Sequence, residues 1–422
     1  MRIAFGHYSS VNDISGVSSW LVELALYLKR HGCSIAIHVL DLGRAGEKSD
    51  LELALTPAGI EIFRSPATGN LRMDLQESLT FLNNWRPDVF LPQCKTHHYV
   101  AAAVAGRCGL AWALTLHSDD PDYWAIAKSL TPERHGGRTV CVSQHILSKL
   151  IRNGGDADAM VIPYGVSIPD SFARFQDHPF HVVYSGRLWE HQKRASLVVE
   201  TLIKACEQGG GRICATLIGD GYSRAACEQQ VREAKLEGLI QFSGRLPAAG
   251  VKDILLNSQA ILLMSDFEGL PVALLEAMAA GVVPVVRAIP SGVPEVVRPG
   301  ETGLLVSDNP EEAAAALLYL AENPVLWERC SSAARQLVSE RFSSEQCHRN
   351  WLELLRQMQS NSSPAYPIRR LHGVRLGALS PLMLEPYKKP SPWQRLRMRQ
   401  RLSTILAKMK RIVKKCCERG GH

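Results

Sequence analysis

The chain lacks any long apolar run. No window of its 422 residues contains the roughly 18 consecutive apolar residues that a membrane-spanning helix needs. The first ten residues, MRIAFGHYSS, also lack the apolar stretch of a secretory signal peptide. We therefore expect a cytoplasmic protein without a membrane span.

Metal and cofactor motifs are missing as well. The eleven cysteines are scattered, with no C-x-x-C pair and no Cys/His spacing typical of zinc. There is no GK[ST] phosphate loop and no GxGxxG fingerprint. The short DPD at 120–122 matches a D-x-D pattern that some sugar-transferring enzymes use for a divalent metal, but Asp with Pro is also typical of a turn. We expect reduced thiols, no metal and no cofactor.

The excess of positive charge is confined to the end of the chain. The net charge is +7, but residues 388–422 contain twelve Lys and Arg against one acid. Of the 48 basic and 41 acidic residues, 36 and 40 therefore lie in the preceding body. A slightly acidic body argues against a groove for nucleic acid.

Short apolar runs alternate with helical patterns along most of the chain, and we predict strands in ten of these runs. Such runs are typical of parallel sheets that are covered on both faces. The predicted strands are residues 2–5, 34–40, 88–92, 111–117, 139–143, 181–186, 213–219, 240–244, 260–265 and 282–288.

Two successive series of strands and helices predict an α/β protein with two doubly wound, Rossmann-like domains. We place the first domain at 1–170 and the second at 178–357, because the pattern lapses across 167–180. Residues 358–422, which begin near SNSSPAYP, are expected to form a linker and a tail. Ligands bind beyond the carboxyl ends of such strands, so the expected site is the cleft between the domains.

A carboxylate inside an apolar helix is the first candidate for function. Glu276 is surrounded by apolar residues, and Pro271 suits the first turn of the helix. Burying an ionised carboxylate without partners costs several kcal/mol, so paired sugar hydroxyls would suit this one. Glu268 precedes it by eight residues, next to Gly269, where the backbone can approach a ligand closely. Taken alone, Glu276 could equally be an exposed residue of a surface helix.

Other candidates follow the predicted strands. Arg187 and Lys193 come after a strand that ends at Gly186, and a fork-shaped donor with a mobile cation would suit a diphosphate. Gly16 opens the first helix and could expose backbone N–H groups to phosphate. His117 ends a strand at the cleft edge. The alternatives are solvated charges, a plain turn and a structural histidine.

Taken in order, these segments resemble the retaining GT-B glycosyltransferases of family 4, which share a Glu-x7-Glu signature. The resemblance covers roughly residues 1–355. Its most specific stretch is MSDFEGLPVALLEAMAAGVVPVV; the others include GVSSWLVELALYLKRHG, TLHSDD, VIPYGV, YSGRLWEHQK and SGVPEVVRPGETGLLV. Two positions depart from the family pattern: Ser15, where a second glycine is common, and Tyr164, where an Asn is common.

The resemblance implies transfer of a sugar from a nucleoside-diphosphate sugar to an acceptor hydroxyl, with retention of configuration. Glu276 would hold the ribose hydroxyls of the donor. Glu268, with the backbone of Gly269 and Leu270, would hold the transferring sugar.

The remaining roles implied by the resemblance concern the diphosphate and the reacting carbon. Arg187 and Lys193 would bind the diphosphate, next to the turn at Gly186. Gly16 would close on the diphosphate from the first domain, and His117 would touch the sugar near the reacting carbon. No motif identifies the base, the sugar or the acceptor.

The end of the chain predicts a basic amphipathic helix. Its apolar stripe consists of Leu402, Ile405, Leu406, Met409, Ile412 and Val413. Such a helix suits an anionic membrane surface, and a lipid-linked or polysaccharide acceptor would fit. We therefore expect a peripheral protein at the inner face of the membrane, in polysaccharide or lipopolysaccharide biosynthesis. Docking to a protein, RNA binding and a solvated tail remain as alternatives for this segment.

Two other functions are compatible with the same fold. One is a nucleotide-sugar epimerase or a phosphorylase, although no local signature of a pyridoxal-phosphate lysine is present. The other is a catalytically silent scaffold at the membrane, against which the combined presence of Glu268, Glu276, Arg187 and Lys193 argues.

Overall fold

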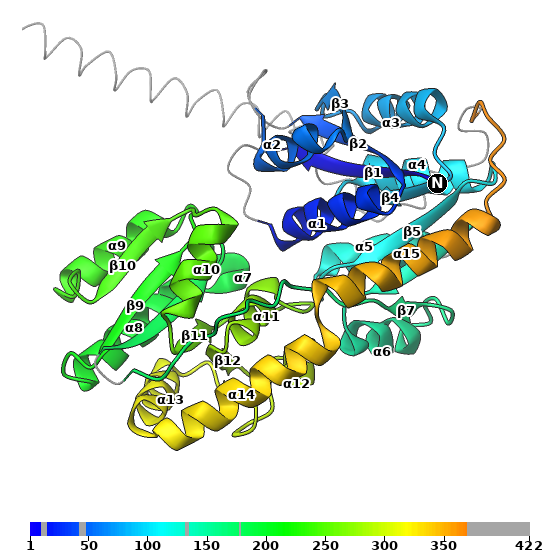
Figure 1. The fold of residues 1–422 in the computed structure, drawn as a ribbon. Helices are drawn as coiled ribbons and strands as arrows, with labels where there is room; N and C mark the ends of the chain where they lie inside the picture. The colour runs from blue at the N-terminus through cyan, green and yellow to red at the C-terminus, as the bar shows by residue number, and fades with distance from the viewer. Residues whose placement is uncertain (10–14, 42–47, 131–134, 177–178, 369–422) are drawn as a thin grey trace, which may run out of the picture.

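The computed structural model describes the chain except for residues 10–14, 42–47, 131–134, 177–178 and 369–422. Two lobes, each built on a parallel sheet with helices on both faces, lie side by side (Figure 1). This confirms the predicted fold class of two doubly wound α/β domains. The predicted basic helix of the tail lies outside the described residues.

The N-terminal domain contains a seven-stranded parallel sheet in the order β3-β2-β1-β4-β5-β6-β7. Its strands are β1 Arg2–Ser9, β2 Ser34–Asp41, β3 Glu61–Pro66, β4 Val89–Pro92, β5 Ala111–Leu116, β6 Gly137–Cys141 and β7 Met160–Val161. Its helices are α1 Gly16–Arg30, α2 Asp50–Leu55, η1 Thr56–Ala58, α3 Leu71–Trp85, α4 Thr96–Gly106, α5 Pro121–Leu130 and α6 Gln144–Arg152.

The C-terminal domain contains a six-stranded parallel sheet in the order β10-β9-β8-β11-β12-β13. Its strands are β8 Phe180–Ser185, β9 Ile213–Ile218, β10 Ile240–Gly244, β11 Ala260–Leu263, β12 Val283–Arg287 and β13 Leu304–Val306. The helices of the second half are α7 Glu190–Lys193, α8 Ala195–Gln208, α9 Arg224–Glu233, α10 Ala248–Leu256, α11 Val272–Ala279, α12 Val293–Val296, α13 Pro310–Glu322, α14 Pro324–Arg341 and α15 Ser344–Ser360.

Apolar burial explains why the ten predicted strands form. Every residue of β5 (AWALTL) and of β11 (AILL) is buried, as expected for a strand covered on both faces. The first helix buries Trp20, Leu21, Leu24 and Leu28 on one face, and Gly32 follows its end with a φ of +79°.

Three strands were not predicted, and each lies toward an end of its sheet. Strand β3 alternates exposed and part-buried side chains, so it has no continuous apolar run. Strand β7 has two residues and β13 has three, which is too short for a pattern to emerge.

Helix α15 packs on the N-terminal domain, although the sequence patterns assigned its residues to the C-terminal domain. The sequence patterns placed residues 344–357 in the second domain, yet Figure 1 shows α15 lying across the first lobe, beside β5. Trp351 packs against Trp20 with ring centroids 5.4 Å apart. Where the chain passes from α14 to α15, Ser344 N donates a hydrogen bond to Val166 O over 2.9 Å. The chain therefore crosses between the domains twice, at 166–179 and at 342–344.

The predicted linker also packs on the N-terminal domain as far as it is described. Ser362 Oγ donates to Asp88 O over 2.7 Å, and Ile368 N donates to Asn83 Oδ1 over 2.6 Å. Residues 358–368 are thus part of the folded body. Within the described part of the chain, no helix combines the length and the apolar character needed to cross a bilayer.

Both sheets reverse their winding at one point, and these points position the site. Strand β4 pairs with β1 in the first sheet, and β11 pairs with β8 in the second. Ligands of doubly wound sheets bind beyond the carboxyl ends of the strands at such a switch point. The loops after β1, β4, β8 and β11 are therefore the places to search for function.

Candidate active site

The loops that follow β8 and β11 bring two charged side chains into direct contact. Lys193 Nζ donates to Glu268 Oε1 over 2.5 Å. The two side chains are only 14% and 9% exposed, so solvent screens this ion pair weakly. Two residues 75 positions apart meet because neighbouring parallel strands end at the same edge.

Arg187 lies in the same loop but is held differently. Its Nη2 donates to Gln192 Oε1 over 2.7 Å, and its guanidinium lies 4.3 Å from the centroid of the Trp189 ring. Gln192 in turn donates from Nε2 to Phe267 O over 3.1 Å, which ties the two loops together. Among the described residues no carboxylate pairs with Arg187.

Gly186 allows the buried Tyr184 to support this loop from below. The Tyr184 hydroxyl donates to Arg187 O over 2.7 Å, and burial raises the pKa of this phenol above its ordinary value. A Cβ at Gly186 would lie 3.2 Å from Tyr184 Oη and 3.8 Å from Lys193 Cε. A Cβ here would therefore crowd the Tyr184 hydroxyl, while its distance to Lys193 would be an ordinary contact.

Gly269 is one of the points at which the second domain touches the first. A Cβ at Gly269 would lie 2.2 Å from His117 O, so no other residue fits here without displacement of the backbone. Gly269 O accepts from Gly292 N over 2.7 Å, and the next residue, Leu270, is 2% exposed. This loop is fixed from both domains.

The starts of helices α1 and α11 face each other across the junction of the lobes. A Cβ at Gly16 would lie 3.3 Å from Val272 Cγ2. Neither N-cap residue, Ser15 or Pro271, provides a side-chain cap, and neither first turn contains an acid. Uncapped backbone N–H groups at helix starts attract anions, so the two helices aim partial positive charge at one place.

Glu276 lies in the second turn of α11, as Pro271 predicted. Its side chain is part-buried, and burial, followed by the negative charge of Glu23, raises the pKa of Glu276 to about 7. Its carboxylate forms no hydrogen bond or ion pair with any described residue. An unpartnered carboxylate here is a place for a ligand that donates hydrogen bonds.

His117 is held by two side chains of its own domain. Its Nδ1 is 2.6 Å from Tyr164 Oη and its Nε2 is 2.5 Å from Gln93 Oε1. Because the amide oxygen only accepts, Nε2 carries the proton and Nδ1 accepts from the tyrosine. Burial, followed by the charge of His7, lowers the pKa of His117 to about 3, so its imidazole is neutral at pH 7.

The hydrogen bonds of His117 give a role to Tyr164, which stands where an Asn is common in the family. The tyrosine takes one ring nitrogen of His117 and stacks on its ring with centroids 5.8 Å apart. Both ring nitrogens are thereby engaged within the protein. The part of His117 that faces the second domain is its carbonyl, next to Gly269.

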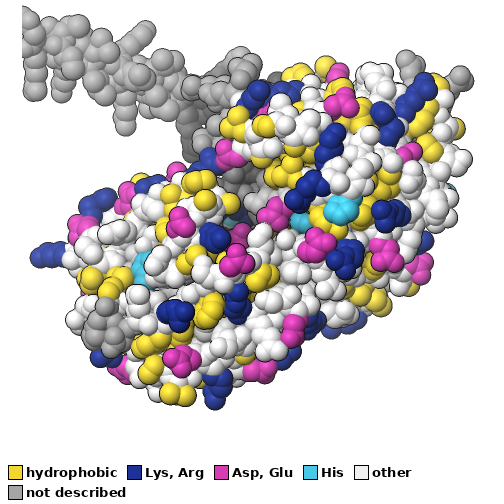
Figure 2. All heavy atoms as spheres, in the orientation of Figure 1, with side chains coloured by type: hydrophobic (Ala, Val, Ile, Leu, Met, Phe, Trp, Pro, Cys, Tyr) yellow, Lys and Arg dark blue, Asp and Glu magenta, His cyan; other side chains and the backbone are white. Residues whose placement is uncertain are grey.

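Figure 2 shows acidic and histidine side chains along the junction of the two lobes. Some contributors were not predicted from sequence. Glu23 on α1 stands among apolar residues in LVELAL, the same signal that singled out Glu276. Gln93, which follows β4, and Gln192, which lies in the short helix α7, had no such signal, because a glutamine outside an apolar run fits many roles.

The DPD stretch forms the start of helix α5, which begins at Pro121. Asp122 N donates to Asp120 Oδ1 over 2.8 Å at the start of α5. The neighbouring Asp119 is paired with Lys149 over 2.5 Å and with His145 over 3.2 Å. Within the described ranges, no three His, Cys, Asp or Glu side chains are grouped to hold a metal ion. The absence of a metal cofactor stays a prediction.

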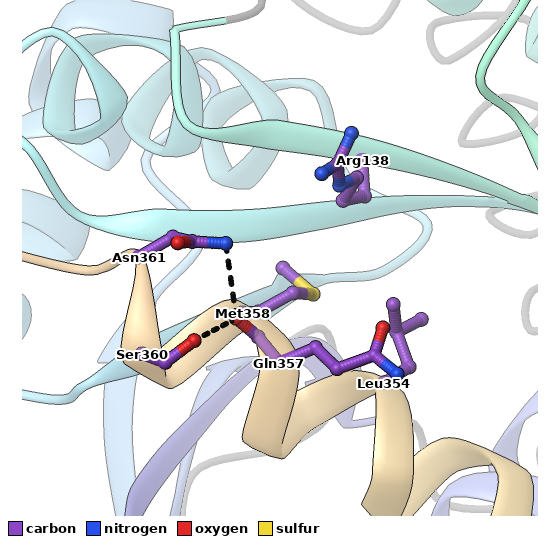
Figure 3. A pocket seen from close by; sticks show the side chains of 6 residues that line it. All are labelled: Arg138, Leu354, Gln357, Met358, Ser360 and Asn361. Atoms are coloured by element: carbon purple, nitrogen blue, oxygen red, sulfur yellow. Dashed lines mark hydrogen bonds between the residues drawn. The ribbon is translucent and has the colours of Figure 1, made fainter.

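A separate hollow lies between β6 and α15, away from the switch points (Figure 3). It has a volume of about 300 Å³ and is lined by Arg138, Leu354, Gln357, Met358, Ser360 and Asn361. Ser360 Oγ and Asn361 Nδ2 both donate to Gln357 O, over 2.8 and 3.2 Å. These bonds satisfy the end of a helix, and none of the predicted site residues reaches this hollow.

Comparison with known families agrees with this geometry. The family described as Glycosyl transferases group 1 matches residues 170–337, and the one described as Glycosyltransferase Family 4 matches residues 14–168. The chain belongs to glycosyltransferase family 4. The family placement expected from the sequence is thereby confirmed, whereas retention of configuration stays a prediction. The junction of the two matches coincides with the first crossing between the domains.

Relatives of this family 4 chain include two bacterial proteins. The putative colanic acid biosynthesis glycosyltransferase WcaL of Salmonella typhimurium is 31% identical over 188 residues, which are 42% of this chain and 45% of WcaL. The amylovoran biosynthesis glycosyltransferase AmsK of Erwinia amylovora is 30% identical over 221 residues, which are 50% of this chain and 54% of AmsK. The matched part thus spans about half of these curated relatives.

A solved structure extends the likeness to the fold. The crystal structure of Anabaena HepE in complex with UDP superposes with a TM-score of 0.69 and covers 85% of this chain and all of that one, at 18% identity. At this identity the likeness concerns the fold, and the family 4 chain adopts the GT-B arrangement.

Proposed function

We propose that the protein transfers a sugar from a nucleoside-diphosphate sugar to an acceptor hydroxyl, with retention of configuration. The observation that carries the proposal is the Lys193–Glu268 pair, which lies at the carboxyl ends of two adjacent strands. A cation for phosphate and an acceptor for sugar hydroxyls are here 2.5 Å apart. That juxtaposition matches a diphosphate and a sugar joined by one bond.

The diphosphate would bind to Lys193, Arg187 and the uncapped start of α11. Lysine has three N–H donors, and one is used by Glu268, so two remain for phosphate oxygens. Arg187 uses one side of its guanidinium for Gln192 and keeps further donors. These cations would stabilise the charge that develops on the leaving diphosphate, without a metal ion.

The transferring sugar would lie between Glu268 and the first domain. Glu268 Oε2 has no partner among the described residues and can accept a sugar hydroxyl, next to the backbone of Gly269 and Leu270. When the bond from the anomeric carbon to phosphate breaks, the acceptor oxygen attacks from the same face. Its proton passes to the departing phosphate oxygen, and the configuration is retained.

His117 would shape the sugar site without transferring a proton. A neutral imidazole whose pKa lies at about 3, with both nitrogens bonded, is a poor base at pH 7. Its carbonyl, together with Gly269, would border the reacting carbon. Glu276 would accept hydrogen bonds from the ribose, and ribose hydroxyls would favour its ionised form.

The acceptor and the location follow from the relatives and from the tail. WcaL and AmsK are named for the biosynthesis of colanic acid and amylovoran, so we propose a growing polysaccharide or a lipid-linked sugar as the acceptor. The basic residues of 388–422 would hold the enzyme at the inner face of the membrane.

Calorimetric titration with UDP, GDP and ADP tests the first step. A transferase binds at least one of these nucleotides, and Arg187→Ala weakens that binding, whereas a silent scaffold binds none. Incubation with the donor alone separates the remaining alternative, because an epimerase would convert the donor sugar in the absence of an acceptor.

A further inference from the structure

Helices α1 and α11 present one carboxylate each to the same space. Glu23 stands seven residues after Gly16, two turns along the same face of α1. Glu276 stands four residues after Val272, one turn along the same face of α11. A Cβ on Gly16 would lie 3.3 Å from Val272 Cγ2, so the starts of the two helices approach each other closely, and Glu23 is near enough for its charge to act on Glu276.

Neither carboxylate has a partner among the described residues. Both side chains are part-buried, and burial raises the pKa of Glu23 as it does that of Glu276. Neither cation of the site pairs with them: Lys193 is bonded to Glu268, and Arg187 is bonded to Gln192. Two part-buried carboxylates, one of which raises the pKa of the other, are unfavourable unless a group with several hydrogen-bond donors lies between them.

We propose that the ribose of the donor lies between Glu23 and Glu276 and donates one hydroxyl to each. This inference rests on the proposed function, in which Glu276 holds the ribose. It adds a ligand from the opposite domain, so the nucleoside itself joins the two lobes. Without a nucleotide, the two carboxylates oppose the approach of the two lobes. With a nucleotide bound, each carboxylate accepts a hydrogen bond from one ribose hydroxyl.

The test is a binding cycle on the full chain. UDP, its 2′-deoxy form and its 3′-deoxy form are titrated into the unmodified protein, Glu23→Ala, Glu276→Ala and the exposed control Glu353→Ala. If UDP does not bind, GDP and its deoxy forms are used. Thermal unfolding of each variant shows that it is folded.

A hydrogen bond to a charged group contributes about 1.5–3 kcal/mol, so each deoxy form should bind roughly 10- to 100-fold more weakly to the unmodified protein. Glu23→Ala should be indifferent to the loss of one hydroxyl, within about twofold, and Glu276→Ala to the loss of the other. Glu353→Ala should behave as unmodified. If Glu23→Ala discriminates against both deoxy forms as strongly as the unmodified protein does, Glu276 alone holds the ribose and the inference is overturned. If no nucleoside diphosphate binds the unmodified protein, the proposed function fails first.

Discussion

Lys193 and Glu268 form an ion pair of 2.5 Å at the shared edge of β8 and β11. The pair joins the segment after β8, which contains Lys193 and Arg187, to the segment after β11, which contains Glu268. Removal of either partner would leave a largely buried charge unpaired, a change that typically costs about 3–5 kcal/mol. This ion pair therefore contributes to both the loop geometry and the electrostatics of the site, together with the Gln192–Phe267 bond between the same loops.

Arg187 offers the cleanest separation of activity from stability. Its guanidinium hydrogen-bonds to Gln192 and lies against the Trp189 ring, it pairs with no carboxylate among the described residues, and its side chain is half-buried. We expect Arg187→Ala to lower sugar transfer by at least about 10²-fold, because charge on the leaving diphosphate loses its stabilisation. Arg187→Lys should fall in between, since it keeps the charge and loses the fork. Nucleotide-release rates together with thermal unfolding check this. Transfer at a near-normal rate in Arg187→Ala would refute the role.

Gly269 tests the contact between the domains. A methyl group here would meet His117 O at 2.2 Å, so Gly269→Ala must move one lobe away from the other. We expect transfer to fall by about 10²-fold, because a misplacement near 1 Å has that effect on a positioned reaction. Gly238→Ala is the matched control, since nothing lies within 4 Å of its Cβ. Equal rates in the two variants would mean that this contact does not matter for catalysis.

The sequence predicted most strands and helices and placed the site at the carboxyl ends of the strands. It did not predict which side chains there form direct contacts. Because parallel strands end at one edge, Arg187 and Glu268 were expected near each other. The direct bond between Lys193 and Glu268 depends on side-chain directions within two loops, which no spacing encodes.

Helix α15 illustrates a different limit. Its apolar face is plain in the sequence, but an amphipathic pattern does not say which sheet it covers. The decisive contacts, such as that of Trp351 with Trp20, join residues more than 300 positions apart. Likewise, the network of His117 combines Gln93 after β4 with Tyr164 after β7, and only the sheet order brings them together.

Buried histidines should make the protein unstable in mild acid. Burial lowers the pKa of five of them from 6.5, to about 3 or 4: His7, His38, His97, His117 and His348. As the pH falls below 6.5, the unfolded chain takes up protons that the folded chain refuses, so the free energy of unfolding falls. By pH 5.5 each contributes a loss of about 1 kcal/mol.

Glu276 acts in the opposite direction and provides the control. Its folded pKa of about 7 exceeds its ordinary value of 4.5, so the folded state takes up a proton between these values and gains stability as the pH falls. Urea denaturation at pH 7.5 and 5.5 should show a net loss of stability, because the histidines outnumber it. Glu276→Gln should show a steeper loss. A stability that does not change or rises between these pH values would contradict both assignments.

The tail can be removed at a point that the structure defines. Because residues 361–368 pack on the N-terminal domain, truncation belongs after Ile368 rather than at Ser360. We expect the full chain to float with anionic vesicles and not with neutral ones, and the chain truncated after Ile368 to remain folded and to sediment. Flotation of the truncated chain to the same extent would assign membrane binding to the folded body.

The central proposal is that the protein binds a nucleoside-diphosphate sugar at the junction of the lobes and transfers its sugar. The most direct measurement incubates the full chain with UDP-, GDP- and ADP-sugars and glycan acceptors, and follows both nucleotide release and the anomeric configuration of the product by NMR. The account predicts release from one donor that depends on an acceptor, a product with the configuration of the donor, and a loss of at least about 10²-fold in Arg187→Ala. Release that is independent of an acceptor, an inverted product, or full activity of Arg187→Ala would contradict it.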